Sequence, residues 1–323
     1  MRKVRVGTRA SKLALTQTTA LAEQLAQAGG FDFELVHVKS DGDRLKASLT
    51  QIGGTGVFVT TLRQALLDGD VDIIVHSLKD LPTYPQEGIG LPTIAKREDP
   101  RDALCARNGY ILETLPQGSK VGTGSPRRAA QLLSLRPDLE IVDIRGNVET
   151  RLARLEDDLD AVVLAYAGLR RLGKDAAVTE VLDPAQFIPA PGQGALAVEC
   201  RADLLEHDDE LNHALIAGLI ACDDLVTRAA VSAERAVLAT AEQGCSAPIG
   251  AYAQLSDEGL FELHAIMYPP TITASTSELN EQGLNKVARE SFTGTIPTDG
   301  NVFAVAEECG KQVATELLES LEQ

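Results

Sequence analysis

The spacing of apolar residues predicts strands and helices that alternate from the start of the chain. Val4 and Val6 alternate with charged residues, as in a strand, and the next apolar residues recur on one helical face over 14–28. Ser11 can cap this helix, and Gly29 and Gly30 can end it. The alternation continues with strands at 33–39 and 72–77 and a helix at 58–67. Such a pattern predicts a parallel sheet covered by helices.

A charged, proline-containing segment, KREDPRD at 96–102, interrupts this pattern and suits a crossing between two domains. The alternation then restarts, with strands at 119–123, 140–144 and 160–167 and helices at 126–135 and 149–156. These segments predict a second α/β unit, although its sequence does not visibly repeat that of the first.

The chain is expected to cross back at IPAPGQGALAVEC, residues 188–200, where prolines and glycines precede a strand-like end. From about residue 216 a long helix-like stretch leads into short alternating segments and a final helix at 302–320, which together predict an α+β unit. We therefore expect an α/β protein with two lobes built on mixed, mainly parallel sheets and a smaller C-terminal α+β domain. The expected domains are residues 1–97 with about 193–214, residues 98–192, and residues 215–323.

Composition narrows the class of protein. With 47 acidic residues against 30 basic ones, the formal charge of −17 argues against a broad nucleic-acid or acidic-membrane surface, so any anion site has to be built locally. No apolar run is long enough for a signal peptide or a membrane span. The five cysteines are scattered and lack CxxC spacing, which predicts neither a disulfide framework nor a metal site. We therefore expect a cytoplasmic protein with reduced thiols.

Cationic side chains follow the ends of several predicted strands. They are Arg9, Lys79, Arg127, Arg128 and Arg145. Ligands bind at this edge of an open α/β sheet because loops and helix N-termini converge there. A series of cations at that edge predicts a ligand that carries several carboxylates.

The segment GTGSPRRAAQ is the most informative of these sites. Ser125 fits an N-cap and Pro126 fits the first helical position, so two arginines occupy the first turn of the helix. The helix dipole disfavours cations there by about 0.3 to 1 kcal/mol. A bound carboxylate held by the guanidinium groups would offset that cost. An ion pair with a neighbouring acidic side chain is the alternative.

The segment RGNVETR, residues 145–151, repeats the arrangement. Gly146 permits a tight turn, Asn147 can cap the next helix, and Arg151 can return towards the same edge. Two further arginines after AYAGL extend the series. Two lobes that present cations in this way predict a cleft for a ligand with several carboxylates.

One carboxylate lies among these cations. HSLKDLP places Asp80 beside Lys79 where a strand ends, and Pro82 prevents the strand from continuing. A carboxylate among cations stays ionised and can stabilise a developing cationic centre or accept hydrogen bonds from pyrrole-type N–H groups. A simple ion pair with a lysine or an arginine is the alternative. His76 in the same segment is interpreted as a strand histidine, not as a base.

Cys245 differs from the other cysteines in its surroundings. It lies in EQGCSAPIG, a loop of small residues in which a large electrophile can approach the sulfur. Cys200, Cys222 and Cys309 fall in strand or helix patterns that predict inert thiols in or near the core. Reactivity depends on surroundings that favour the thiolate, so an unreactive loop cysteine remains the alternative.

Eight segments resemble, in the same order, the signature stretches of the porphobilinogen deaminase (hydroxymethylbilane synthase) family. They are HSLKDLP, KREDPRDAL, VGTGSPRRAAQL, RGNVETRL, YAGLRRLG, PAPGQGALAVEC, SAERA and GCSAPIGAYA, within about residues 4–253. The resemblance implies three domains, of which the first two are similar to the lobes of periplasmic binding proteins, with the catalytic cleft between them. It also implies a transferase of porphyrin and heme biosynthesis. Such an enzyme joins four porphobilinogen molecules head to tail with loss of ammonia, then releases hydroxymethylbilane by hydrolysis.

The resemblance assigns roles to individual residues. Cys245 would carry a dipyrromethane cofactor through a thioether, and Asp80 would handle pyrrole N–H groups and the cationic intermediates formed as ammonia leaves. The implied cofactor contacts are Ser77, Lys79, Asp80, Thr123, Ser125, Arg127, Arg128, Arg145 and Gly146. The implied substrate contacts are Arg9, Ser11, Arg145, Arg151, Arg171 and Gln193. The resemblance further implies a monomer that binds porphobilinogen and the growing oligopyrrole chain.

Three positions depart from the family pattern. Gln51 and Thr55 stand where the family often carries lysines, and Gly124 replaces a common serine, so two cationic contacts and one hydroxyl group are missing. Because the acid, the cysteine and the arginines remain, we expect altered handling of the lengthening chain, not loss of activity. The segment 40–57, rich in glycine, serine and aspartate, suits either a mobile lid or a plain linker.

Two other classes of protein would share parts of this pattern. A two-lobed anionic small-molecule binding protein would have the same fold and anion site, but the sequence shows no signal peptide or DNA-binding helix pair, and Cys245 would be unexplained. A cysteine hydrolase would need a histidine that activates the thiol, and none of the five histidines shows a family-specific spacing to it.

Overall fold

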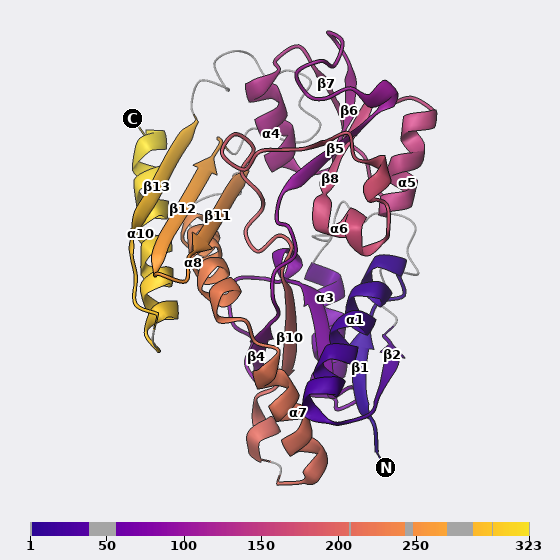
Figure 1. Cartoon of the computed structure of the whole chain (residues 1–323), viewed down its shortest axis with the longest axis vertical. Helices are drawn as coiled ribbons and strands as arrows, with labels where there is room; N and C mark the ends of the chain where they lie inside the picture. Colours follow the sequence, from indigo (N-terminus) through magenta and orange to yellow (C-terminus); the bar gives the residue numbers. More distant parts are fainter. Residues whose placement is uncertain are drawn as a thin grey trace. The chain divides into compact units, whose positions relative to one another are not determined.

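The computed structural model describes residues 2–38, 56–206, 208–242, 248–269, 287–298 and 300–322. The chain divides into two compact units, each made of two segments, whose elements are labelled in Figure 1. The first unit contains Met1–Glu98 and Ala195–Arg228, and the second contains Asp99–Gly194 and Ala229–Gln323. The three-domain division expected from the sequence stays a prediction.

A five-stranded sheet forms the centre of the first unit. Its strands, in spatial order, are β2 (Phe33–His37), β1 (Val4–Thr8), β3 (Ile73–Ser77), β10 (Leu196–Arg201) and β4 (Ile89–Ile94). Strand β1 is parallel to β2 and β3, whereas β10 runs antiparallel to β3 and β4. The parallel strands therefore end at one edge of the sheet, where β1 leads into Arg9 and β3 leads into Leu78.

Helices cover both faces of this sheet. They are α1 (Lys12–Gly29), α3 (Gly56–Leu67) and α7 (Glu210–Ala221). On one face Leu25 of α1 and Leu215 of α7 share a buried core with Ile73. On the other face Leu66 of α3 packs in a core with Ile74. Ile73 and Ile74 are neighbours in β3 but pack into different cores, because successive side chains of a strand point to opposite faces.

The ends of α1 follow the signals in the sequence. Ser11 is the N-cap, and its Oγ accepts a hydrogen bond from the Ala14 backbone N–H at 3.3 Å. Gly30 ends the helix with a φ of 74°, in the left-handed region that glycine adopts without strain. The helix predicted between Ser11 and Gly29 is therefore confirmed.

The stretch expected as one long helix from about residue 216 is instead two helices, α7 and α8 (Leu225–Glu242). Helix α7 ends at Ala221, and Asp224 Oδ1 accepts a hydrogen bond from the Thr227 backbone N–H at 2.8 Å in the first turn of α8. The expectation of one helix was wrong because the apolar spacing continues across a capping aspartate that starts a new helix.

The second unit contains a sheet with the same strand order and directions as the first. Its strands, in spatial order, are β7 (Glu140–Val142), β6 (Lys120–Gly122), β8 (Ala161–Ala165), β5 (Asp102–Ala106) and β9 (Glu180–Val181). Strand β6 is parallel to β7 and β8, and β5 runs antiparallel to β8 and β9. The reversed fourth strand is β5 here and β10 in the first unit, so each sheet incorporates a strand that borders a crossing between the units. The two units thus share the same sheet arrangement, although their sequences show no visible repeat.

Three helices belong to this part of the second unit: α4 (Pro126–Leu135), α5 (Val148–Ala153) and α6 (Tyr166–Arg171). The bounds of α4 agree with the helix predicted at 126–135. Strands β4, β5 and β9 were not predicted, because β4 contains a glycine and a proline, β5 follows a charged segment, and β9 has only two residues.

The C-terminal part of the second unit has its own sheet. It consists of β11 (Ile249–Leu255), β12 (Leu260–Met267) and β13 (Ala288–Thr295), all antiparallel, with α8 and α10 (Val302–Glu322). Val237, Phe261 and Val313 share its core. Helices α8 and α10 approach closely at Gly310, where a Cβ atom would lie 2.3 Å from the Ala233 carbonyl oxygen.

The expected fold class is confirmed, with two α/β units on mixed sheets and a smaller sheet and helices at the C-terminal end. Among the described residues, no helix combines the length and apolarity needed to cross a bilayer.

Candidate functional site

A pocket of about 120 Å³ lies at the edge of the first unit where β1 and β3 end. Four residues predicted from the sequence line it: Arg9, Ser11, Ser77 and Asp80. Arg9 directly follows β1, and Asp80 closes a short 3₁₀ turn after β3 whose first residue, Leu78, is buried. Lys79 belongs to the same turn but is not among the described residues that line the pocket.

The polar groups of this pocket are held by named contacts. The Arg9 guanidinium carbon lies 3.6 Å from the centroid of the Phe58 ring of α3, a cation–π contact. Ser77 Oγ donates a hydrogen bond to Gln17 Oε1 at 3.1 Å. Ser11 caps α1, so the positive end of an 18-residue helix lies at the pocket wall. Asp80, in contrast, is exposed and is the one carboxylate among the described lining residues.

A buried charge network lies behind this pocket. His76 Nε2 lies 3.1 Å from Glu199 Oε2, and Arg63 Nη2 lies 2.6 Å from Glu199 Oε1. Burial raises the pKa of Glu199, but hydrogen bonds from His76 and Arg63 outweigh it and leave the pKa below its ordinary value. His76 is a strand histidine, as predicted. Glu199 and Arg63 were missed, and the signal for Glu199 was an acid inside the apolar strand LAVECR.

In the second unit, the turn after β6 has the local structure that its sequence predicts. Ser125 is the N-cap of α4, and its Oγ accepts a hydrogen bond from the Arg128 backbone N–H at 3.4 Å. Pro126 occupies the first helical position, and Thr123 Oγ1 accepts from the Ser125 backbone N–H at 3.2 Å. Arg127 and Arg128 thereby fall in the first turn, as expected.

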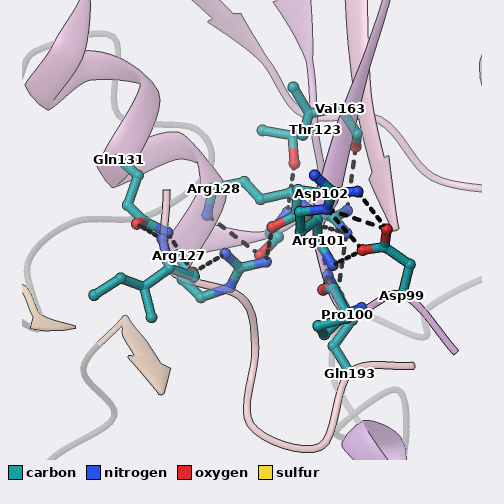
Figure 2. A network of polar contacts seen from close by, with 12 residues as sticks. Asp99, Pro100, Arg101, Asp102, Thr123, Arg127, Arg128, Gln131, Val163 and Gln193 are labelled. Atoms are coloured by element: carbon teal, nitrogen blue, oxygen red, sulfur yellow. Dashed lines mark hydrogen bonds and ion pairs between the residues drawn. The ribbon is translucent and has the colours of Figure 1, made fainter. Parts of the chain in front are cut away.

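Both of these arginines pair with one buried acid, Asp102 (Figure 2). Arg127 Nη2 lies 2.7 Å from Asp102 Oδ2, and Arg128 Nη2 lies 2.7 Å from Asp102 Oδ1. Both arginines therefore have the ion pair with a neighbouring acid that the sequence left open as an alternative, and their contact with a ligand carboxylate stays a prediction. Sequence reasoning assigned Asp102 only to a charged crossing segment. Its signal was an acid immediately before the apolar run ALCA.

Burial and charge compete at Asp102. Burial raises its pKa, but the charges of Arg127 and Arg128, with hydrogen bonds, lower the pKa to about 2. Burial also lowers the pKa of Arg127, and the charge of Arg128 lowers it further. Two buried guanidinium groups thus repel each other electrostatically and share one carboxylate.

A second pair of arginines lies after β7. Arg145 is exposed, with Nη2 at 3.4 Å from Asp143 Oδ2. Arg151 Nε donates a hydrogen bond to the Gly146 carbonyl oxygen at 2.9 Å, and Gly146 has a φ of 109°, which favours glycine. Burial lowers the pKa of Arg151, and the charges of Arg128 and Arg145 lower it further, so these cations act on one another.

The remaining predicted contacts of this unit lie at its return segment. Gln193 Nε2 donates to Asp102 Oδ1 at 2.9 Å and to the Pro100 carbonyl oxygen at 2.7 Å. Arg171 Nη2 donates to the Gly194 carbonyl oxygen at 2.6 Å. The structure thus brings Arg127 and Gln193 to the same carboxylate.

Cys245, Gln51 and Thr55 lie outside the described residues, as does nearly all of the segment 40–57. Helix α8 ends at Glu242 and β11 begins at Ile249, on either side of Cys245. The four described cysteines are free thiols: Cys105, Cys200, Cys222 and Cys309. Burial raises the pKa of Cys105 to about 12 and contributes to raising that of Cys200 to about 11, which makes both unreactive.

Two family models together match most of the chain. The family model described as porphobilinogen deaminase, dipyromethane cofactor binding domain, matches residues 4–209. The model described as porphobilinogen deaminase, C-terminal domain, matches residues 228–319.

Two curated relatives align over almost the whole chain. A porphobilinogen deaminase of Thermobifida fusca is 49% identical over 316 residues, covering 98% of this chain and 93% of the relative. A porphobilinogen deaminase of Leifsonia xyli subsp. xyli is 49% identical over 318 residues, covering 98% and 92%. Among solved structures, an immunogenic lipoprotein A from Vibrio vulnificus aligns with 67% of this chain and 94% of its own, at 14% identity and a TM-score of 0.38.

Proposed function

The chain belongs to the porphobilinogen deaminase family, and we propose that it carries out the family's reaction with the residues of these two sheet edges. It is a transferase of tetrapyrrole synthesis, with a dipyrromethane cofactor-binding domain over residues 4–209. The family match supports this function over that of an anionic small-molecule binding protein.

In the proposed reaction four porphobilinogen molecules are joined head to tail, each with loss of ammonia, and hydroxymethylbilane is released by hydrolysis. Departure of ammonia leaves positive charge on a pyrrole, so a nearby carboxylate lowers the barrier. Asp80 is the one carboxylate among the described residues of the first unit's pocket, and it is exposed to an incoming ligand. This observation carries the assignment of Asp80 as the catalytic residue.

The cations of the pocket suit the acetate and propionate groups of porphobilinogen. Arg9 is held against Phe58, which fixes the orientation of a guanidinium that can bind a carboxylate through two parallel hydrogen bonds. Ser11 stands at the N-terminus of α1, where free backbone N–H groups favour anions. We assign both residues to substrate binding.

The charges of the second unit fit a carboxylate-rich cofactor. Four guanidinium groups, those of Arg127, Arg128, Arg145 and Arg151, face two carboxylates in the described contacts, those of Asp102 and Asp143. An additional anion would therefore be stabilised there.

When bound, the dipyrromethane supplies the primer on which pyrroles are joined. We assign it to Cys245, Ser77, Lys79, Asp80, Thr123, Ser125, Arg127, Arg128, Arg145 and Gly146, and the growing chain to Arg145, Arg151, Arg171 and Gln193.

Intact mass spectrometry tests the proposal. Purified protein should be heavier than its sequence by two linked pyrrole units, and the Cys245→Ser variant should lack that excess. The wild-type protein should also consume porphobilinogen and release hydroxymethylbilane. A wild-type protein of unmodified mass that forms no product would overturn the proposal.

The proposed enzyme is a cytoplasmic monomer. The scattered cysteines without paired spacing suit a reducing compartment, and the described ones are all free thiols. Light scattering coupled to size-exclusion chromatography should give one chain mass of 34.4 kDa plus the cofactor, and a mass of two chains would contradict the monomer.

A further inference from the structure

Asp102 begins β5, at the edge of the second unit where the predicted ligand contacts gather. It pairs in register with Ala165, the last residue of β8. Because β5 runs antiparallel to β8, the start of β5 lies at the same edge as the carboxyl ends of the parallel strands. The side chain of Asp102 is fully buried there.

Three side chains from two other segments converge on this carboxylate (Figure 2). Arg127 Nη2 donates to Oδ2 at 2.7 Å. Arg128 donates to Oδ1 from Nε at 2.9 Å and from Nη2 at 2.7 Å. Gln193 Nε2 donates to Oδ1 at 2.9 Å. One carboxylate thus sets the orientation of three residues that the proposed function places at cofactor or substrate.

The network does not neutralise its own charge. Arg127 and Arg128 share the single charge of Asp102, and their other described partners are uncharged: backbone carbonyl oxygens, the side-chain oxygen of Gln193 and the ring of Phe187. Arg127 Nη1 donates to Ile188 O at 2.6 Å, and Arg128 Nη1 donates to Val163 O at 3.2 Å. One positive charge therefore remains at a fixed place, which a bound carboxylate can balance.

The same carboxylate links the two segments that connect the units. Gln193, next to the return crossing, binds both Asp102 and the carbonyl oxygen of Pro100 in the outgoing crossing, the latter at 2.7 Å. The orientation of the arginines is thereby tied to the backbone at both crossings. Loss of Asp102 would free all of these groups together.

We infer that Asp102 is a positioning residue, which orients Arg127, Arg128 and Gln193 so that the paired arginines present one uncompensated positive charge to a carboxylate of the dipyrromethane. This inference rests on the proposed function and adds to it a residue that does not touch the cofactor. It predicts that Asp102 acts on cofactor loading and turnover through the arginines, beyond any effect on folding.

The test compares Asp102→Asn with a matched control, Asp99→Asn. Asp99 lies three residues earlier in the same crossing segment and pairs with Arg101, at 2.6 Å from its Nη2. For each full-length variant, intact mass gives the fraction that carries the cofactor, steady-state assays of the loaded fraction give kcat and KM, and circular dichroism reports folding. For folded Asp102→Asn we expect loading or kcat/KM to fall by about tenfold or more, since misplaced binding groups cost that much, while Asp99→Asn stays near wild type.

Chemical rescue distinguishes positioning by charge from a loss of packing. Asp102→Ala leaves space at the arginines, and added formate should restore loading several-fold, whereas chloride or formamide at equal concentration should not. Rescue by formamide as good as that by formate would overturn the inference, as would Asp102→Asn protein with wild-type loading and turnover. A wild-type protein without the mass excess would instead overturn the proposed function.

If neither Asp102 variant folds, a crystal structure of the loaded wild-type enzyme decides. The inference expects Arg127 or Arg128 to contact a cofactor carboxylate while both still contact Asp102. It is overturned if the arginines have left Asp102, or if neither reaches the cofactor.

Discussion

At the scale of single residues, the arginines of the proposed site differ in their partners and in their burial. Arg9 is packed on an aromatic ring, Arg127 is buried against an acid, and Arg145 is mostly exposed. The sequence presents all three as cations after strands, yet their surroundings differ. Substitutions at such positions therefore separate effects on chemistry from effects on stability.

Asp80→Asn should abolish most turnover while leaving the fold intact. The side chain is exposed, so its substitution should change the free energy of unfolding by less than about 0.5 kcal/mol. Loss of its negative charge should lower kcat by at least about a hundredfold. Hydroxymethylbilane formation and urea unfolding measure the two effects. Glu87→Gln, an exposed acid of the same unit, is the control, and wild-type turnover in Asp80→Asn would refute the catalytic role.

Gly124→Ser should destabilise the protein even though serine is common in the family at that place. A Cβ atom on Gly124 would lie 2.6 Å from the carbonyl oxygen of Ile144, which is backbone and cannot rotate away. We expect a loss of about 1 to 3 kcal/mol in the free energy of unfolding, measured by urea denaturation. Gly300→Ser is the control, because a Cβ there meets nothing within 4 Å. Equal stability of the two variants would show that the backbone adjusts at no cost.

At the scale of elements, a helix with clear capping residues could be predicted from the sequence. Strands with few apolar residues and the break between two helices could not. Helix α4 was predicted to its terminal residues because Ser125 and Pro126 specify its start. Strand β13 was not predicted, since only alternate residues of ARESFTGT pack inward and few are apolar. The break between α7 and α8 was missed although Asp224 is a capping residue.

Ion-pair partners were the hardest feature to predict. Asp102 and Arg127 are 25 positions apart, and they meet because β5 is inserted beside β8 in the sheet. Sequence spacing contains no such information, so the alternative of an ion pair could be stated but its acid could not be named. The pocket of the first unit was predicted better, because Arg9 follows β1 and Asp80 lies in the turn after β3, and these parallel strands end at one edge.

The ion pairs of Arg127 and Arg128 in α4 with Asp102 in β5 should make the free energy of unfolding depend on pH in the acid range. The pKa of Asp102 is lowered from 3.8 to about 2 in the folded protein, so the ionised carboxylate contributes stability that is present above the unfolded pKa. That contribution, about 2 kcal/mol, is lost as pH falls from about 5 towards 2. Asp102→Asn lacks this carboxyl group, so its free energy of unfolding should fall less over that range.

Urea unfolding at a series of acidic pH values measures this slope. Asp257→Asn, which removes an exposed carboxyl group between β11 and β12, should keep the wild-type slope. If Asp102→Asn lost stability with falling pH as steeply as the wild-type protein, the acid sensitivity would come from other groups.

At the scale of the whole molecule, an acidic chain has to bind an acidic substrate. The formal charge of −17 repels an anion at long range, while the arginines attract it at short range. At physiological salt the Debye length is about 8 Å, so the distant repulsion is already screened and the near attraction is not. This distinction allows an acidic chain to bind carboxylates at a local cluster of cations, as the proposed function requires.

Added salt should therefore weaken substrate capture, and Arg145 should be responsible for much of that dependence. Its side chain is 73% exposed, so salt screens its charge far more than it screens the buried Arg127 and Arg128. We expect kcat/KM for porphobilinogen to fall several-fold between about 0.15 and 0.5 M sodium chloride in the wild-type protein. In Arg145→Ala the slope should be shallower, and chains of fewer than four pyrroles should accumulate on the enzyme.

Mass spectrometry of the trapped enzyme reports the length of those chains, and steady-state assays give the salt slope. Arg154→Ala is the matched control, because Arg154 also pairs with a nearby surface acid, Asp158, and has no part in the proposed site. An Arg145→Ala variant with the wild-type slope and full-length chains would mean that an exposed guanidinium group at this edge does not reach the substrate. Substrate capture at the second unit's edge would then depend on Arg127 and Arg128, which share Asp102. The one positive charge that this acid leaves uncompensated would be the main attraction for the substrate there.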